Sequence, residues 1–149
     1  MIKIVKTNSE NSDFRYLVKF LDAELAQRDG AEHLFYAQLN KIDTLKYVVL
    51  AYEDSQLAGC GAFKELDHDT VEIKRMFTPV MYRGKGVAMN ILSELEKWAK
   101  ELGYKKCVLE TGKKQPEAIA LYKKSQYQII PNYGQYVGIE NSVCFEKMI

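Results

Sequence analysis

Apolar residues recur at helical spacing in two long stretches of the chain. The first stretch predicts a helix over residues 12–28 that ends at Gly30. The second separates apolar from charged positions most regularly and predicts a helix that begins near residue 87 and ends at Gly103. Its expected buried face consists of Val87, Ile91, Leu92, Leu95, Trp98, Ala99 and Leu102. A shorter helix is predicted over 116–124, while residues 32–39 fit a short helix and an irregular loop equally well.

Runs of β-branched and small apolar residues predict the strands of one sheet. The expected strands cover residues 2–6, 46–52, 56–65, 71–78, 105–110, 127–130 and 142–148. A turn at 53–55 joins the second and third strands, and the fourth extends them to an antiparallel meander that ends before Pro79. The strand after the long helix should pair in parallel with this meander through a right-handed crossover. No linker or repeat interrupts the pattern, which indicates one mixed α/β domain over residues 1–149.

Composition argues against several function classes. Apolar residues make up 47% and charged residues 28% of the 149 positions, which is typical of a folded globular protein. The formal net charge of +1 does not support nucleic-acid binding, and no apolar run reaches the roughly 18 residues of a membrane span. The three cysteines and two histidines lack metal-ligand spacing. Odd, widely spaced cysteines and the lack of a signal-peptide pattern predict a cytoplasmic protein with buried free thiols and no metal.

Glycines and basic residues between a predicted strand and a predicted helix form the clearest candidate binding site, residues 83–88 with the sequence RGKGVA. Small residues let a ligand approach the backbone, and the first amides of a helix lack internal partners, so the stretch predicts a diphosphate site. It is not a P-loop, which needs Lys-Ser/Thr after the second glycine. It is not a dinucleotide fingerprint either, because Met89 replaces the third glycine. The alternative is a sharp connection with a solvated basic surface.

The surroundings of this loop resemble the acetyl-CoA-binding core of the GCN5-related N-acetyltransferase (GNAT) superfamily. Its hallmark Q/R-x-x-G-x-G/A is matched by Arg83, Gly86 and Ala88. Residues 109–112 and 115–124 resemble the family's later strand and its N-x-x-A-x-x-L-Y helix, and the order of elements agrees over essentially the whole chain. The resemblance implies an α/β (α+β) fold. It would be a mixed, mostly antiparallel sheet of six to seven strands with about four helices on its faces.

The resemblance also implies where acetyl-CoA, the co-substrate, would bind. The amides of the 83–88 loop would hold the CoA diphosphate, and its two basic side chains would add charge-assisted contacts. The end of strand 71–78 would pair with the pantetheine arm as an added strand does, and would splay from strand 105–110 to admit the thioester. The implied donor-binding residues are Met76, Thr78, Arg83, Gly84, Lys85, Gly86, Val87, Ala88 and Gln115. Gln115 stands where the family usually carries Asn, and Gln126 where many members carry Gly.

Acetyl transfer to an amine sets two chemical requirements, which the resemblance assigns to two residues. A general base must remove the amine proton, and Glu72 matches the family's acidic residue on this strand. The alternative for Glu72 is a solvent-facing carboxylate beside Lys74, and Glu110 on the neighbouring strand is a second candidate base. The leaving thiolate can be protonated or hydrogen-bonded by a phenol, and Tyr122 matches the family's tyrosine in that role, with a core-edge tyrosine as its alternative.

The sequence leaves the acceptor open. A small-molecule amine is favoured because the charge is balanced, and segment 29–45 and the loop with Tyr133 and Tyr136 are expected to wall its site. A non-catalytic acyl-CoA-binding sensor or interaction module is the alternative function. The lysines at 113, 114, 123 and 124 are better explained as a solvated face or a contact with the cofactor's 3′-phosphate than as a nucleic-acid site. The resemblance leaves a homodimer open.

Overall fold

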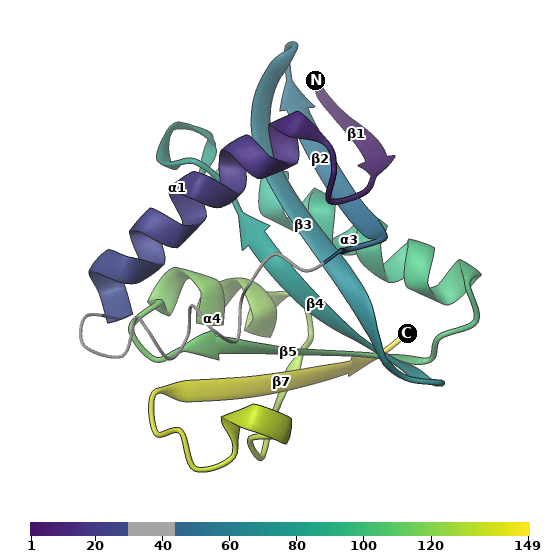
Figure 1. Ribbon diagram of the computed structural model, residues 1–149, viewed down its shortest axis with the longest axis vertical. Helices are drawn as coiled ribbons and strands as arrows, with labels where there is room; N and C mark the ends of the chain where they lie inside the picture. Colours follow the sequence, from purple (N-terminus) through teal and green to yellow (C-terminus); the bar gives the residue numbers. More distant parts are fainter. Residues whose placement is uncertain (30–43) are drawn as a thin grey trace.

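The computed structural model describes residues 1–29 and 44–149 (Figure 1). The strands are β1 (Ile2–Thr7), β2 (Tyr47–Glu53), β3 (Gln56–Asp67), β4 (Thr70–Phe77), β5 (Lys106–Gly112), β6 (Gln128–Ile130) and β7 (Ser142–Met148). The helices are α1 (Ser12–Asp29), α3 (Val87–Glu101) and α4 (Pro116–Lys124), with short 3₁₀ turns at Val80–Tyr82 and Gly134–Tyr136.

One sheet holds all seven described strands in the order β1-β2-β3-β4-β5-β7-β6. Only β4 and β5 are parallel, as the predicted crossover requires, and every other neighbouring pair is antiparallel. The mixed, mostly antiparallel sheet is therefore confirmed. The described residues hold three α-helices against about four predicted, because the helix considered for 32–39 lies outside the described residues.

The helices cover the sheet on both faces. α3 and α4 pack against one face with Phe63, Ile91, Leu95 and Phe145 in the core, whereas α1 packs against the other face through Phe14 and its apolar neighbours. Figure 1 shows α1 in front of the sheet and α3 behind it. Five of the seven residues predicted for the buried face of α3 are buried, and Trp98 is partly buried against the core. Leu102 is 47% exposed, because the helix ends at Glu101 and Leu102 caps it. Within the described residues, no helix is both long and apolar enough to cross a bilayer.

The second half of β4 contains a bulge and is not paired with β5. The register between β3 and β4 shifts after Lys74, where Arg75 takes the left-handed conformation at φ 59°. Such a conformation is uncommon for a residue with a side chain and marks local strain. β4 and β5 are paired through only three residue pairs, the last of which joins Glu72 to Val108. Beyond that pair the two strands are no longer paired, as the predicted splay requires.

Close approach between α3 and β3 depends on glycine at position 61. A Cβ at Gly61 would lie 2.5 Å from the Met76 sulfur and 2.8 Å from Cγ2 of Ile91, closer than real side chains pack. We expect Gly61→Val to lower the free energy of unfolding by about 1–3 kcal/mol through overpacking, measured by urea denaturation. Ala120→Val, an exposed change on α4, is the control and should cost well under 1 kcal/mol. Equal losses in the two variants would contradict the close packing.

Candidate functional site

The 83–88 loop joins the end of β4 to the N-terminus of α3. Gly84 and Gly86 have φ values of 79° and 83°, a region that side chains disfavour, so both glycines are required by the turn. Gly86 is the N-cap of α3, and the Asn90 side chain donates to its carbonyl at 2.7 Å. The first amides of α3 have no partners within the helix, and the helix dipole adds partial positive charge at this end. A Cβ at Gly84 would meet no atom within 4 Å, so open space lies over the loop.

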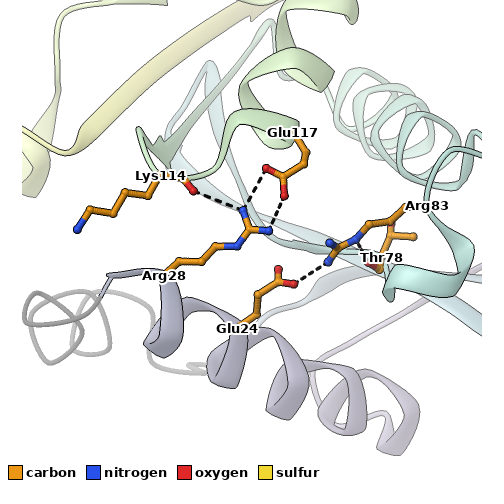
Figure 2. A network of polar contacts seen from close by, with 6 residues as sticks. All are labelled: Glu24, Arg28, Thr78, Arg83, Lys114 and Glu117. Atoms are coloured by element: carbon orange, nitrogen blue, oxygen red, sulfur yellow. Dashed lines mark hydrogen bonds and ion pairs between the residues drawn. The ribbon is translucent and has the colours of Figure 1, made fainter.

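The side chain of Arg83 is engaged with neighbouring elements (Figure 2). Its Nε donates to the Thr78 carbonyl at 2.7 Å, and its Nη2 donates to Glu24 of α1 at 2.9 Å. Thr78 and Arg83, both predicted to contact CoA, are therefore hydrogen-bonded to each other, and the Arg83 guanidinium already has a carboxylate partner. Sequence reasoning missed Glu24 because an acidic residue on an amphipathic helix is indistinguishable from one on a solvated face.

A second arginine joins α1 to α4 next to this contact. Arg28 donates through both terminal nitrogens to the two carboxylate oxygens of Glu117, and more weakly to the Lys114 carbonyl at 3.5 Å. The hydrogen bonds from Arg28 hold the pKa of Glu117 at about 2. Figure 2 shows the Arg28–Glu117 and Arg83–Glu24 pairs side by side, so that α1 contacts both α4 and the arginine of the 83–88 loop.

The splayed ends of β4 and β5 enclose a cleft. Four residues predicted from the sequence line it, namely Glu72 and Met76 on β4, Gln115 at the N-cap of α4, and Tyr122 within α4. Glu110 of β5 lines it as well. The structure thus brings the candidate base, the alternative base and the candidate acid to one cavity, although they are up to 50 residues apart in the sequence.

The two candidate bases are both held by hydroxyl groups from the C-terminal part of the chain. Glu72 is 5% exposed, accepts a hydrogen bond from the Tyr133 hydroxyl at 2.6 Å, and lies 3.8 Å from the ammonium of Lys74. The alternative of a solvent-facing Glu72 is therefore wrong, although its proximity to Lys74 is confirmed. Glu110 accepts from the Ser142 hydroxyl at 2.7 Å. Burial lowers the pKa of Lys74, while Glu72 opposes this shift.

The phenol of Tyr122 is buried next to the cleft. It is 6% exposed, and its ring packs against those of Tyr127 and Phe145 at centroid distances of 5.8 and 5.9 Å. Burial raises its pKa, and the nearby Glu110 carboxylate adds to the shift. A raised pKa keeps the hydroxyl protonated at neutral pH, which is the state a proton donor needs.

The cysteines are buried thiols, as predicted. Cys60, Cys107 and Cys144 are free and lie in strands. Burial raises the pKa of Cys107 to about 12, so the nucleophilic thiolate is disfavoured. The described residues contain no cluster of three or more His, Cys, Asp or Glu placed to hold a metal ion.

Comparison with known proteins decides the family. A sequence profile described as the acetyltransferase (GNAT) family matches residues 11–127, which is well over half of the chain. The chain belongs to the GNAT family. This result confirms the resemblance drawn from the loop and the Tyr122 helix, and the family assignment supports acyltransferase activity.

Individual relatives agree with the family assignment. This GNAT chain is 38% identical over 101 residues to the uncharacterized N-acetyltransferase YsnE of Bacillus subtilis (strain 168), an alignment that covers 66% of the chain and 67% of the relative. A crystal structure of a putative acyl-CoA N-acyltransferase from Klebsiella pneumoniae superposes with a TM-score of 0.83 at 25% identity, covering 99% and 97% of the two chains. A GNAT acetyltransferase from Elizabethkingia anophelis, solved with acetyl-CoA bound, superposes at 0.70 with 19% identity and coverage of 99% and 98%.

The walls expected for the acceptor site are partly described. Tyr136 lines the cleft, and Tyr133 contacts Glu72 beside it. Most of segment 29–45 lies outside the described residues, so its expected role stays a prediction. From the other side of the cleft, α1 of this GNAT domain contributes Leu21 and Leu25. Gln126 adopts a φ of 72°, which is the left-handed turn that the family's usual glycine at this position indicated.

Proposed function

We propose that this GNAT protein is an acetyl-CoA-dependent N-acetyltransferase that moves an acetyl group directly to a small-molecule amine while both substrates are bound. The observation that carries the proposal is the continuity of the site along β4. This strand carries Glu72 and Met76 in the cleft and then leads into the glycine loop at the start of α3. One strand therefore connects the proposed diphosphate site to a cleft with acidic and phenolic groups. The three free, buried thiols also support a reducing compartment, and we propose the cytoplasm.

The residues present fit acetyl-CoA as the donor. The amides of residues 84–88 would bind its diphosphate, because open space lies over Gly84 and the dipole of α3 favours an anion there. The unpaired edge of β4 at Met76 would receive the extended pantetheine arm as an added strand. The thioester supplies an activated acetyl group, and holding it beside the amine accounts for much of the expected rate gain.

Glu72 and Tyr122 would manage the two protons. Deprotonation of an amine with a pKa of about 10.4 costs roughly 4–5 kcal/mol near pH 7, so a positioned base is needed. A carboxylate oxygen of Glu72 would accept this proton, directly or through a water. The Tyr122 hydroxyl would donate its proton to the departing sulfur, and its raised pKa keeps that proton available.

An acceptor screen tests the proposed activity. The protein would be incubated with acetyl-CoA and a panel of small amines, and free CoA thiol would be measured together with the acetylated amine by mass spectrometry. We expect at least one amine to give thiol release and acetylated product in equal amounts. If acetyl-CoA raises the melting temperature and no amine gives release, the enzyme assignment fails and a non-catalytic acyl-CoA sensor remains.

The Arg83–Glu24 pair yields a prediction about donor affinity. Diphosphate must compete with the Glu24 carboxylate for Arg83, so Glu24→Gln should tighten CoA binding. A partly exposed ion pair is worth up to about 1 kcal/mol, which corresponds to a roughly fivefold lower Kd by calorimetry. Glu10→Gln makes the same charge change at an exposed position before α1 and should leave the Kd unchanged. Weaker binding in Glu24→Gln would mean that Glu24 positions Arg83 for the ligand instead.

A further inference from the structure

An arginine that the proposed reaction does not use lies in the cleft wall. Arg75 stands at the bulge of β4 in the left-handed conformation, and its side chain is only 4% exposed. Its Nη1 donates to Asp22 of α1 at 2.7 Å, and Asp22 is itself 51% exposed. Within residues 1–29 and 44–149, this is the one hydrogen bond of the guanidinium. Among the residues that the structure describes, this buried guanidinium therefore forms one ion pair, and the carboxylate in it is half-exposed.

The guanidinium has capacity for a second anion. It carries five N–H donors in a planar fork that matches a carboxylate through two parallel hydrogen bonds, and the contact to Asp22 uses one nitrogen. A carboxylate that accepted hydrogen bonds from the other nitrogens would add charge-assisted contacts at the buried end of the side chain. Hydrogen bonds between a guanidinium and a carboxylate are among the stronger ones in proteins, so such a ligand would be recognised with specificity.

The charges of the cleft are arranged in opposite pairs. Glu72 and Glu110 are acidic, and Lys74 and Arg75 are basic, and all four line the same cavity. An acceptor that carried only an ammonium group would meet two cations as well as two anions. A molecule with both an amine and a carboxylate would complement both, since opposite potentials across an interface determine specificity.

We propose that Arg75 anchors a carboxylate of the acceptor, so that the acceptor class is a small amine that also carries a carboxylate, as amino acids do. The inference rests on the proposed acetyl transfer. Glu72 and Arg75 are three residues apart on β4, so their Cα atoms lie at most roughly 10 Å apart, and both residues line the same cavity. One end of a small molecule can therefore reach Arg75 while its amine lies beside Glu72. Specificity arises because an acceptor that lacks the carboxylate leaves the guanidinium without its second partner.

Matched acceptor pairs test this assignment. The panel would contain α-amino acids and ω-amino acids of two to six carbons together with their primary amides. The amides keep the amine but lack the negative charge of the carboxylate. We expect the wild-type protein to prefer the acid over its amide by at least about tenfold in kcat/KM, mainly through KM. Arg75→Gln should bring the acid-to-amide ratio close to one, and Arg75→Lys should keep part of the preference because the charge remains.

The acid-to-amide ratio separates recognition from stability. Arg75 also ties β4 to α1, so Arg75→Gln can lower the melting temperature and the activity toward every acceptor, yet a purely structural role leaves the ratio unchanged. Asp22→Asn retains Arg75 and removes its competing carboxylate, so it should lower KM for the acid and not for the amide. A wild-type preference for amides, or an unchanged ratio in both Arg75→Gln and Asp22→Asn, overturns the assignment.

A binding measurement distinguishes failure of this inference from failure of the proposed activity. Calorimetry with N-acetyl amino acids and their amides requires no turnover. If no amine is acetylated but the wild-type protein binds the acid more tightly and Arg75→Gln loses that preference, the carboxylate site stands and the acetyltransferase assignment fails. If amines are acetylated and acid and amide bind equally, the activity stands and the carboxylate site is excluded.

Discussion

Glu72→Gln should lower kcat for amine acetylation by roughly 10²-fold or more, the usual loss when a general base is removed. The change keeps the shape of the side chain and leaves an oxygen that can accept the Tyr133 hydrogen bond, now 2.6 Å long. It removes the carboxylate that would take the amine proton. The affinity for CoA should not change, because Glu72 is not among the residues proposed to bind CoA. Stopped-time assays of thiol release at saturating substrates, with calorimetry for CoA, separate the two quantities.

Two further variants make this result specific. Glu65→Gln changes an exposed carboxylate of β3 that accepts a hydrogen bond from Tyr104, and its kcat should match the wild type. Glu110→Gln alters the other carboxylate of the cleft, which is held by Ser142. If Glu110→Gln loses more activity than Glu72→Gln, the base is Glu110, and the role given to Glu72 is wrong.

Gly84→Ala should raise the Kd for CoA by about tenfold to a hundredfold. The added methyl group meets no protein atom within 4 Å, so it projects into the space where a diphosphate would approach the loop amides. Losing one hydrogen bond to a charged group costs roughly 1.5–3 kcal/mol, which gives this range. The φ of 79° adds a backbone cost of about 1–2 kcal/mol to the stability of the variant.

Gly103→Ala is a matched control at the other end of α3. Gly103 also has a positive φ, 99°, and a Cβ there also meets nothing within 4 Å. The two variants should therefore lose similar stability in urea denaturation, and only Gly84→Ala should lose CoA affinity by calorimetry. Equal CoA affinity in both variants would contradict the placement of the diphosphate at this loop.

Local patterns were sufficient to predict the helices and strands, whereas the mostly antiparallel sheet of six to seven strands was implied by the resemblance to the GNAT superfamily. Helical spacing located α3 from Val87 onward, because its buried residues repeat every three or four positions along one face. Alternating and apolar runs located the seven strands to within two residues at their ends. The loop was recognisable from its two glycines. Gly84 and Gly86 occupy backbone conformations that other residues avoid, so the turn itself requires glycine at these positions.

The contacts that complete the site were not predictable from single positions. The Arg75–Asp22 and Arg83–Glu24 pairs join residues 53 and 59 positions apart, and no local pattern links an acid on α1 to an arginine in the second half of β4 or its loop. The bulge also left no signal, since Arg75 has a positive φ although such values favour glycine. Glu72 was placed on the correct strand, but its hydrogen bond from Tyr133 joins residues 61 positions apart, which no local pattern links.

The donor site can be tested by mapping where CoA binds in solution. Backbone amide signals of ¹⁵N-labelled protein would be followed in ¹H–¹⁵N correlation spectra while CoA is added. The largest shifts should fall on the amides of residues 84–88 and on Met76 and Thr78, with smaller ones around Gln115. Unchanged loop amides, combined with saturable shifts near Ser93 and Lys124 in the separate hollow between α3 and α4, would contradict the assignment of the β4–α3 loop as the CoA site.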